Sequence, residues 1–391
     1  SSSNGLEKRP KLRFPGFDEP LVKFEIGNAC EQLKETIDPR TTPTKFYSEY
    51  SMPAFDNNRK VARVQGKDMN SARKIMSKPC VLINKLNVRK KRIWLVEHPE
   101  KNAVSSTEFV PLTSTMMSLG YLNYVALTDR FTNYMLNCSS GSSNSQKRVT
   151  PDDIMDYVIT VPSLLEQERV ASFLETIDAK IQAQHDLIEL LKKYKRGLLS
   201  NLFSEKSTQG WTTKSYYFSE IAQRRSEKYN PTSGIEYPCV ELENIEQETG
   251  KIFATVPSTA QCSIKNIAMP GDTLFGKLRP YLRKYAFAKK TMACSSEIWA
   301  LIPSDVVLPK FLFYLVQTEQ FLRVANISSG TKMPRAEWSN IEKAEFFIPD
   351  FSVQRKVVSL LEGLDQKVAF ADSALFSLNR LKASLLQQLF I

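Results

Sequence analysis

The chain is poor in the residues that most often carry catalysis or bind metals. Its 391 residues include two histidines, His98 and His185, and neither has a possible metal ligand at a useful spacing. The six cysteines are scattered without a CxxC pair, which favours reduced thiols over a zinc site or a disulfide framework. No Walker A pattern is present, which excludes an ATP-binding loop of that type. The sequence therefore predicts no metal site, no cofactor and no catalytic residue in this chain.

Long apolar runs are also missing. No run of 18 apolar residues occurs, so we expect no membrane-spanning helix. The first residues, SSSNGLEKRPKLRF, contain no apolar stretch of the kind found in secretory signals. We therefore expect a cytoplasmic protein that does not bind a membrane. A chain of this length has room for two or more domains, because a single core rarely grows beyond about 250–300 residues.

What the sequence does contain is a repeat. Residues 162–203 and 349–390 align without a gap at a spacing of 187 residues, and 14 of the 42 aligned positions are identical. The identical pairs include Asp178 with Asp365 and Lys195 with Lys382. Because the chain is little more than twice this spacing, the repeat predicts a duplicated unit and with it the architecture.

Each copy of the repeat has the apolar pattern of a coiled-coil helix. Apolar residues recur at alternating steps of four and three, the 3.5-residue period of a helix that packs along another helix. Two independent amphipathic helices are the alternative, but the length and regularity favour pairing of the two copies as an antiparallel coiled coil. Lys195 and Lys382 occupy the same polar position of this seam. The predicted seam residues are Val170, Leu174, Ile177, Ile181, Ile188, Leu191, Leu198, Val357, Leu361, Leu364, Val368, Leu375, Leu378 and Leu385.

Each repeated helix follows a segment with the composition of a mixed α/β domain. Runs of β-branched and aromatic residues predict strands at 81–83, 93–96, 157–161, 273–275, 285–288, 298–302 and 344–348. The segments 121–131 and 311–321 predict helices. We expect an α+β fold of pseudo-two-fold, duplicated architecture, in which two globular α/β domains accompany two long helices. The expected boundaries are 1–161 and 204–348 for the domains and 162–203 and 349–391 for the helices.

Positive charge gathers at corresponding places in the two domains. Twelve basic residues and one acid lie between Arg59 and Arg92, and six basic residues and no acid lie between Asp272 and Glu297. Lysine and arginine contact phosphates, and arginine and asparagine also bond to base edges. A solvated basic face is the alternative for either run alone, but two corresponding runs in a chain of formal net charge +11 favour nucleic-acid binding.

One pattern resembles a nuclease metal site without qualifying as one. Pro349-Asp350 followed by Asp365-Gln366-Lys367 has the order of a PD…(D/E)xK motif. That motif is built on strands, whereas Asp365 and Lys367 lie inside the predicted seam helix. The first copy has Pro162-Ser163 where the second has Pro349-Asp350. The pattern therefore indicates helix contacts and not chemistry.

The whole layout resembles the specificity subunit of type I restriction–modification systems. The most specific parts are the two repeated helices, from Leu165-Glu166-Gln167 to Ile181 and at the endings KRGLLSNLF and KASLLQQLF. The opening KRPKLRFPGF, the stretch GKLRPYL at 276–282 and Ser140-Gly141 with Gln146-Lys147-Arg148 are also similar to that family. Only about a third of the helix positions agree between the copies, fewer than in many members, so docking at the two copies need not be equivalent.

The resemblance implies a DNA-binding subunit without catalysis. Each domain would recognise one half of a split target in double-stranded DNA, while the paired helices set the spacer between the halves. The expected partners are two modification subunits and two restriction subunits, which would hold S-adenosylmethionine, ATP and Mg²⁺. A stand-alone nuclease or methyltransferase and a non-specific DNA-binding scaffold are the alternatives. From charge clustering and matching places in the two domains, the candidate DNA-binding residues are Lys85, Arg89, Arg92, Lys147, Arg148, Lys277, Arg279, Arg283, Lys332 and Arg335.

Overall fold

A computed structural model describes residues 10–141, 146–203, 211–327 and 333–390. The chain forms two compact units, unit 1 of Ser1–His185 with Ala374–Ile391 and unit 2 of Asp186–Ser373. Each unit thus contains one sheet-rich domain, part of one long helix and part of the other. The predicted boundaries divide the chain into consecutive segments, whereas these two units group residues by their spatial contacts. The units therefore do not test the predicted domain boundaries, which stay predictions.

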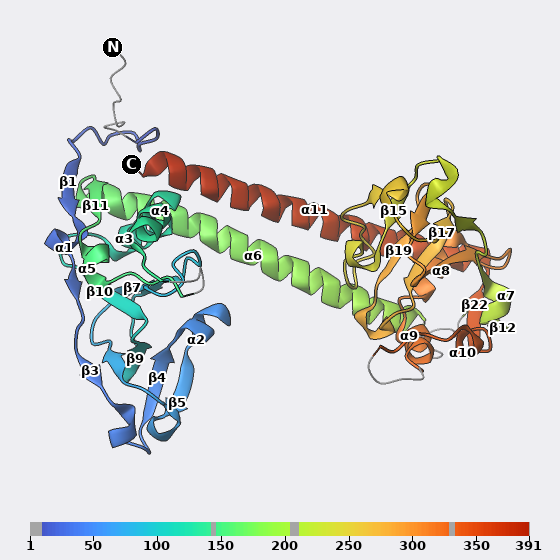
Figure 1. Cartoon of the computed structure of the whole chain (residues 1–391), viewed down its shortest axis with the longest axis horizontal. Coiled ribbons are helices and arrows are strands. Elements are labelled where there is room, and N and C mark those ends of the chain that lie inside the picture. Colours follow the sequence, from blue (N-terminus) through green and yellow to red (C-terminus); the bar gives the residue numbers. More distant parts are fainter. Residues whose placement is uncertain (1–9, 142–145, 204–210, 328–332, 391) are drawn as a thin grey trace, which may run out of the picture. The chain divides into compact units, whose positions relative to one another are not determined.

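Two helices of 39 residues each occupy the repeated segments, α6 at Leu164–Leu202 and α11 at Phe351–Leu389 (Figure 1). A buried glutamine holds the start of each helix in the same way. The Gln167 amide donates to the Pro162 carbonyl and accepts from the backbone N–H of Ser118. The Gln354 amide donates to the Pro349 carbonyl and accepts from the backbone N–H of Leu308. The duplicated glutamine therefore joins each helix start to its own domain.

The two helices pack antiparallel within each unit. In unit 1, Leu385 and Leu389 near the end of α11 share one core with Val170 and Leu174 near the start of α6. In unit 2, Leu199 near the end of α6 shares a core with residues near the start of α11, Val357 and Leu361. All fourteen predicted seam residues are buried or half-buried, as the heptad pattern leads one to expect.

The polar seam lysines form a duplicated contact that also includes the domains. In unit 2, Lys195 Nζ lies 2.5 Å from Asp365 Oδ1, and the Tyr314 hydroxyl donates to Asp365 Oδ2 at 2.8 Å. In unit 1, Lys382 makes the same contact with Asp178, which accepts from the Tyr124 hydroxyl at 2.9 Å. We call each set a Lys–Asp–Tyr contact. Because the tyrosine lies on a domain helix, each contact links both long helices to the domain beside them.

Unit 1 contains two larger sheets and one strand pair. The first sheet has the order β2-β10-β7-β8, the second has the order β3-β6-β9-β4-β5, and β1 pairs antiparallel with β11. The strands are β1 (Val22–Glu25), β2 (Glu31–Gln32), β3 (Thr36–Ile37), β4 (Phe46–Tyr50), β5 (Ala62–Gln65), β6 (Arg73–Ile75), β7 (Cys80–Asn84), β8 (Ile93–Val96), β9 (Ala103–Ser106), β10 (Phe109–Thr113) and β11 (Val158–Val161). The helices are α1 (Ile26–Ala29), α2 (Met52–Asp56), α3 (Leu119–Leu127), α4 (Asp129–Cys138) and α5 (Pro151–Met155).

Unit 2 repeats this topology. Its sheets have the orders β13-β21-β18-β19 and β14-β17-β20-β15-β16, and β12 pairs antiparallel with β22. The strands are β12 (Thr213–Tyr217), β13 (Ala222–Arg224), β14 (Lys228–Tyr229), β15 (Pro238–Val240), β16 (Val256–Pro257), β17 (Lys265–Ala268), β18 (Thr273–Gly276), β19 (Tyr285–Phe287), β20 (Met292–Cys294), β21 (Ile298–Pro303) and β22 (Glu345–Pro349). The helices are α7 (Phe218–Ile221), α8 (Pro309–Leu315), α9 (Glu319–Ala325) and α10 (Trp338–Ile341).

All seven predicted strands are present, but the two predicted domain helices were wrong in one respect. Each is broken into two helices, α3 with α4 and α8 with α9. Thr128 separates α3 from α4, and residues 316–318 separate α8 from α9; the extended backbone of Thr128 and of Thr318 begins the second helix of each pair. Each threonine hydroxyl accepts the backbone N–H three residues later, a strong N-cap. Apolar periodicity continues through both breaks, so it could not reveal them.

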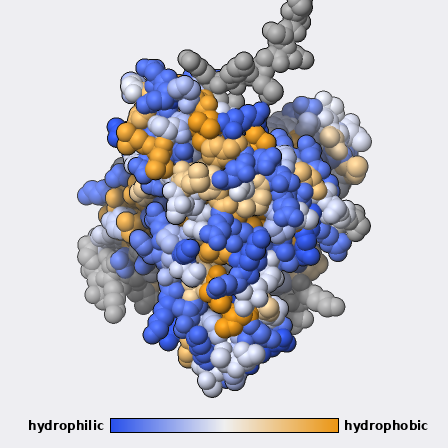
Figure 2. All heavy atoms as spheres, turned by 90° about the vertical axis from the view of Figure 1, so that its left-hand side faces the viewer, coloured by the Kyte–Doolittle hydropathy of each residue, from blue (hydrophilic) through white to orange (hydrophobic). Residues whose placement is uncertain are grey.

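In the part of the chain that the structure describes, no helix is long and apolar enough to cross a membrane. Figure 2 shows the face of unit 1 that lies on the left in Figure 1. Hydrophilic side chains cover most of this face, and hydrophobic ones form smaller separate patches between them.

Candidate nucleic-acid interface

The first candidate loop of unit 1 leaves β7 and is held by a buried asparagine. The Asn84 side chain donates to the Leu86 carbonyl at 2.8 Å and accepts from the backbone N–H of Arg92 at 3.2 Å. Asn87 takes a left-handed conformation with φ of 53°, which asparagine tolerates better than most residues. These contacts shape residues 85–92 into a defined loop that leaves Arg89 exposed.

A second segment, some sixty residues later in the chain, packs against this loop. The backbone N–H of Asn87 donates to the Lys147 carbonyl at 2.9 Å, and that of Val149 donates to the Lys85 carbonyl at 3.0 Å. Leu86 and Arg148 form an antiparallel bridge between these bonds. The structure thus brings together Lys85, Arg89, Lys147 and Arg148, which the sequence placed in two separate clusters.

Unit 2 builds the same loop pair from different residues. The backbone N–H of Arg279 donates to the Pro334 carbonyl at 2.7 Å, and that of Ala336 donates to the Lys277 carbonyl at 2.8 Å. Leu278 and Arg335 form the corresponding bridge. Arg279 has a φ of 51°, so it repeats the left-handed conformation of Asn87 at the equivalent place. Lys277, Arg279 and Arg335 therefore lie together, while Lys332 falls outside the described residues.

A carboxylate holds one arginine of each loop pair. Arg148 lies 2.8 Å from Glu108 in unit 1, and Arg335 lies 3.0 Å from Glu297 in unit 2. The hydrogen bonds that Arg335 donates to Glu297 raise the pKa of Arg335 above its ordinary value. Both arginines remain exposed, and a guanidinium has five N–H donors, so each still has donors to offer a ligand. The carboxylates orient these side chains without using up their hydrogen-bonding capacity.

Other candidates are engaged within the protein. Arg92 is buried, and its guanidinium donates to both carboxylate oxygens of Asp56 at 2.9 and 2.6 Å. These bonds lower the pKa of Asp56 and leave Arg92 without an exposed face for DNA. Arg283 contacts Glu319 at 2.7 Å, as Lys91 contacts Asp129 at 2.6 Å in unit 1. The geometry gives Arg92 and Arg283 structural roles, which their charge in the sequence did not reveal.

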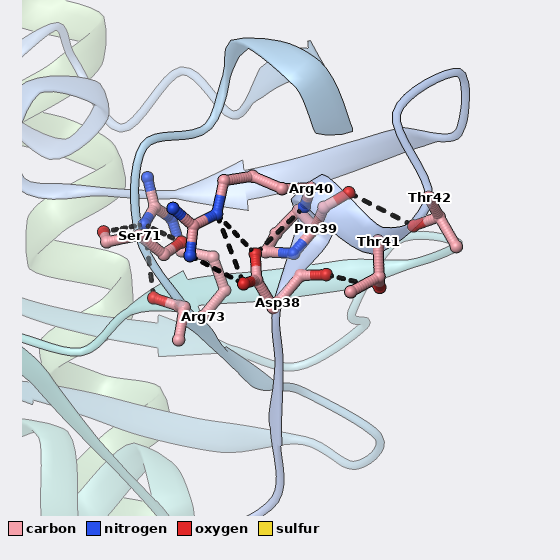
Figure 3. Close-up of polar contacts among 8 residues, drawn as sticks. Asp38, Pro39, Arg40, Thr41, Thr42, Ser71 and Arg73 are labelled. Carbon is pink, nitrogen blue, oxygen red and sulfur yellow. Dashed lines mark hydrogen bonds and ion pairs between the residues drawn. The ribbon is translucent and has the colours of Figure 1, made fainter.

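Two further arginines of unit 1 also serve the fold, as Figure 3 shows. Arg40 turns back onto the carboxylate of Asp38, which also accepts the backbone N–H of Arg40 and so caps a short 3₁₀ helix. The Arg73 guanidinium donates to Ser71 (Figure 3). It also donates to the Glu49 carboxylate. Three of the twelve basic residues in the run from Arg59 to Arg92, namely Arg73, Lys91 and Arg92, are thus paired with acids from outside the run.

The comparisons with known proteins agree on one family. A family model described as "Type I restriction modification DNA specificity domain" matches residues 216–374. The EcoDI specificity subunit of Escherichia coli is 23% identical over 298 residues, which cover 64% of this chain and 65% of that protein. The MjaVIII specificity subunit of Methanocaldococcus jannaschii is 24% identical and covers 66% of this chain and 68% of its own length.

The chain is similar to type I restriction–modification specificity subunits. A solved S subunit from M. genitalium shares its fold, with a TM-score of 0.59 at 16% identity over 98% of this chain and 99% of that one. A chain from a structure of a type I restriction–modification system aligns with a TM-score of 0.62 at 19% identity over 97% and 98%. The match to the EcoDI protein spans just under two thirds of its length.

These curated relatives are named specificity subunits of type I restriction enzymes. Among the described residues, no group of three or more histidine, cysteine, aspartate or glutamate side chains could hold a metal ion. The interface described above offers hydrogen-bond donors and positive charge. Such groups can bind phosphates and base edges.

Sequence reasoning missed the tyrosines of the two Lys–Asp–Tyr contacts. Tyr124 and Tyr314 lie outside the repeated helices, and the sequence alone gave them no role. A signal was present, because each tyrosine lies four residues before its capping threonine, Thr128 or Thr318. Aligning the two domains on these threonines would have paired the tyrosines.

Proposed function

We propose that this chain is a specificity subunit and recognises a bipartite target in double-stranded DNA, with one half-site for each sheet-rich domain. The observation that carries the proposal is the duplicated pair of packed loops. The two domains give these loops the same backbone arrangement but different side chains. Lys85, Arg89, Lys147 and Arg148 would contact one half-site. Lys277, Arg279 and Arg335 would contact the other, with Lys332 as a further candidate. Different side chains on one frame are what two different half-sites require.

The long helices would set the spacing between the half-sites. Each has 39 residues and is about 58 Å long at ~1.5 Å per residue. In DNA-binding dimers, protein geometry fixes the spacing of half-sites in a comparable way. Inserting seven residues at matching places in both helices adds about 10 Å, close to the rise of three base pairs. The selected spacer should then lengthen by about three base pairs while both half-sites stay the same, and an unchanged spacer would contradict this part of the proposal.

The helices would also bind the modification subunits. Large apolar side chains are exposed on them, including Leu190 and Tyr194 on α6 and Phe370 and Phe376 on α11. Contiguous exposed apolar surface often marks protein–protein contacts, and Leu190 and Tyr194 lie one helical turn apart. We propose a complex with two modification and two restriction subunits in the cytoplasm, in which those partners hold S-adenosylmethionine, ATP and Mg²⁺.

The test of recognition is target selection with the assembled complex. Libraries of duplex DNA are selected with the unaltered chain and with Arg89→Ala in unit 1 or Arg279→Ala in unit 2. Each variant should lose affinity, and any relaxed base preference should be confined to one half-site, a different one for each variant. If both variants change the same half-site, the assignment of one half-site to each domain fails. If the unaltered chain shows no sequence preference, the proposed function itself fails.

A further inference from the structure

Unit 2 contains a basic hollow beside its candidate DNA interface. It has a volume of about 600 Å³ and lies between the edge strand β13, strand β21 and the short helix α10. Lys277 belongs both to this hollow and to the loop pair described above, so the two surfaces are continuous. Its lining includes the basic residues Arg224, Lys228 and Lys277 and the aromatic residues Trp299 and Trp338.

Arg224 is exposed and held by aromatic rings in place of a carboxylate. Its guanidinium carbon lies 4.8 Å from the centre of the Trp338 ring and 5.8 Å from that of Trp299. The two rings meet edge to face at 5.6 Å, which fixes the wall of the hollow. Its neighbour Arg225 differs, because Asp272 and Glu227 bind its guanidinium. Within the described ranges, Arg224 has no ion pair, so its charge is available to a ligand.

The equivalent hollow of unit 1 has the opposite character. It flanks the edge strand β2 and the short helix α5, the counterparts of β13 and α10, and has a volume of about 660 Å³. Three carboxylates line it, from Glu31, Glu35 and Asp152, together with Lys34 and Lys78. The residues of the unit 2 hollow include four basic side chains and no acid. The duplication therefore kept the hollow and changed its charge in one unit.

We infer that the hollow of unit 2 binds a backbone phosphate of duplex DNA next to the half-site that this unit recognises. A guanidinium stacked on a ring still directs its N–H donors outward in its own plane, and Lys228 and Lys277 add charge around the same space. The tryptophan wall offers an apolar surface for the deoxyribose beside that phosphate. The inference rests on the proposed function, because continuity with the loop pair is what favours DNA over another polyanion. The carboxylates in the hollow of unit 1 would repel a phosphate, so the inference is restricted to unit 2.

The test compares Arg224→Ala in unit 2 with Lys78→Ala in unit 1, both in the assembled complex. DNA affinity is measured between 50 and 200 mM salt for the selected target and for a scrambled duplex. With Arg224→Ala, affinity for both duplexes should fall about three- to tenfold, and the slope of log K against log salt should decrease by about 0.9. Arg224→Lys should restore most of the slope, and Lys78→Ala should change neither quantity.

The outcomes separate this inference from the proposed function. If the unaltered complex selects its target but Arg224→Ala leaves affinity and slope unchanged, the hollow does not bind DNA and the function stands. Loss of partner-subunit binding with intact DNA affinity would show that the hollow binds protein, and it would also overturn the inference. If the unaltered complex selects no target, the proposed function is wrong, and the inference that rests on it is wrong as well. Circular dichroism of each variant shows whether a loss reflects unfolding.

Discussion

The Lys–Asp–Tyr contact of unit 2 makes a quantitative prediction about the pairing of the long helices. Lys195 is nearly buried, with 9% of its side chain exposed, whereas a third of the Asp365 side chain reaches solvent. Asp365→Ala therefore leaves a buried ammonium without its carboxylate. Lys195→Met removes the buried charge and leaves an aspartate that water and Tyr314 can still satisfy. The cost of the two changes should differ even though both break the same ion pair.

The magnitudes follow from this burial. Removing one partner of a fully buried ion pair costs roughly 3–5 kcal/mol, and the partial exposure of Asp365 puts Asp365→Ala near about 3 kcal/mol. Lys195→Met should cost about 1–1.5 kcal/mol, the usual worth of one hydrogen bond. The double variant Lys195→Met/Asp365→Ala should cost less than the sum of the two single changes, because it leaves no buried charge. In unit 1, the side chains of Lys382 and Asp178 are 22% and 39% exposed, so Asp178→Ala should cost less, about 1–2 kcal/mol.

Urea unfolding of the full chain can measure these differences. Three of the four tryptophans, Trp211, Trp299 and Trp338, belong to unit 2, so their fluorescence reports mainly on that unit. Hydrogen exchange of α11 residues 374–389 reports on unit 1. The reasoning is refuted if Lys195→Met costs more than Asp365→Ala, or if the two changes are additive in the double variant.

Three further predictions follow from the described residues. Arg92→Ala should destabilise the protein by about 1–2 kcal/mol in urea unfolding, because it removes the packing and the two hydrogen bonds of a buried side chain while water can still satisfy Asp56. Arg89→Ala should instead weaken DNA binding and leave stability within about 0.5 kcal/mol, and the reverse pattern would return Arg92 to the interface. Gly250 has a φ of 75°, and an added Cβ would lie 2.7 Å from Phe313, so Gly250→Ala should lower the melting temperature. Gly363 lies on α11 with open space around it, so Gly363→Ala should raise the melting temperature through the higher helix propensity of alanine. Burial, with a smaller effect of Lys85, lowers the pKa of Lys74 to about 8, so protonation of Lys74 favours the unfolded chain. The free energy of unfolding should therefore rise with pH from about 8 toward 10 when compared with that of Lys74→Met. Equal pH profiles for the two proteins would show that Lys74 has its ordinary pKa.

The sequence was most informative where the structure depends on local periodicity. The heptad pattern predicted both long helices and their seam, because burial along a helix follows directly from spacing. The similar tripeptides Lys85-Leu86-Asn87 and Lys277-Leu278-Arg279 form equivalent loops. Asn87 and Arg279 share a left-handed backbone, so the likeness reflects a common turn and not a common side chain.

Sequence was least informative where charge depends on distant partners. Arg92 and Arg73 belong to one basic run, yet Asp56 and Glu49, which neutralise them, lie outside that run. A charge count along the chain cannot show such pairs, because the fold decides which acid meets which base. The hollow of unit 2 was hidden for the same reason, since Arg224 and Trp338 are separated by more than a hundred residues. Thr128 and Thr318 were missed as helix caps because apolar residues continue on both sides of them.

The central claim is that two domains on one duplicated frame recognise two separated half-sites. Footprinting of the assembled complex on its selected duplex tests it most directly. The account predicts two protected patches with an unprotected gap between them, and loss of protection at only one patch when the loop-pair residues of one unit are replaced. A single continuous footprint, or loss of both patches from changes in one unit that leave the fold intact, would contradict it.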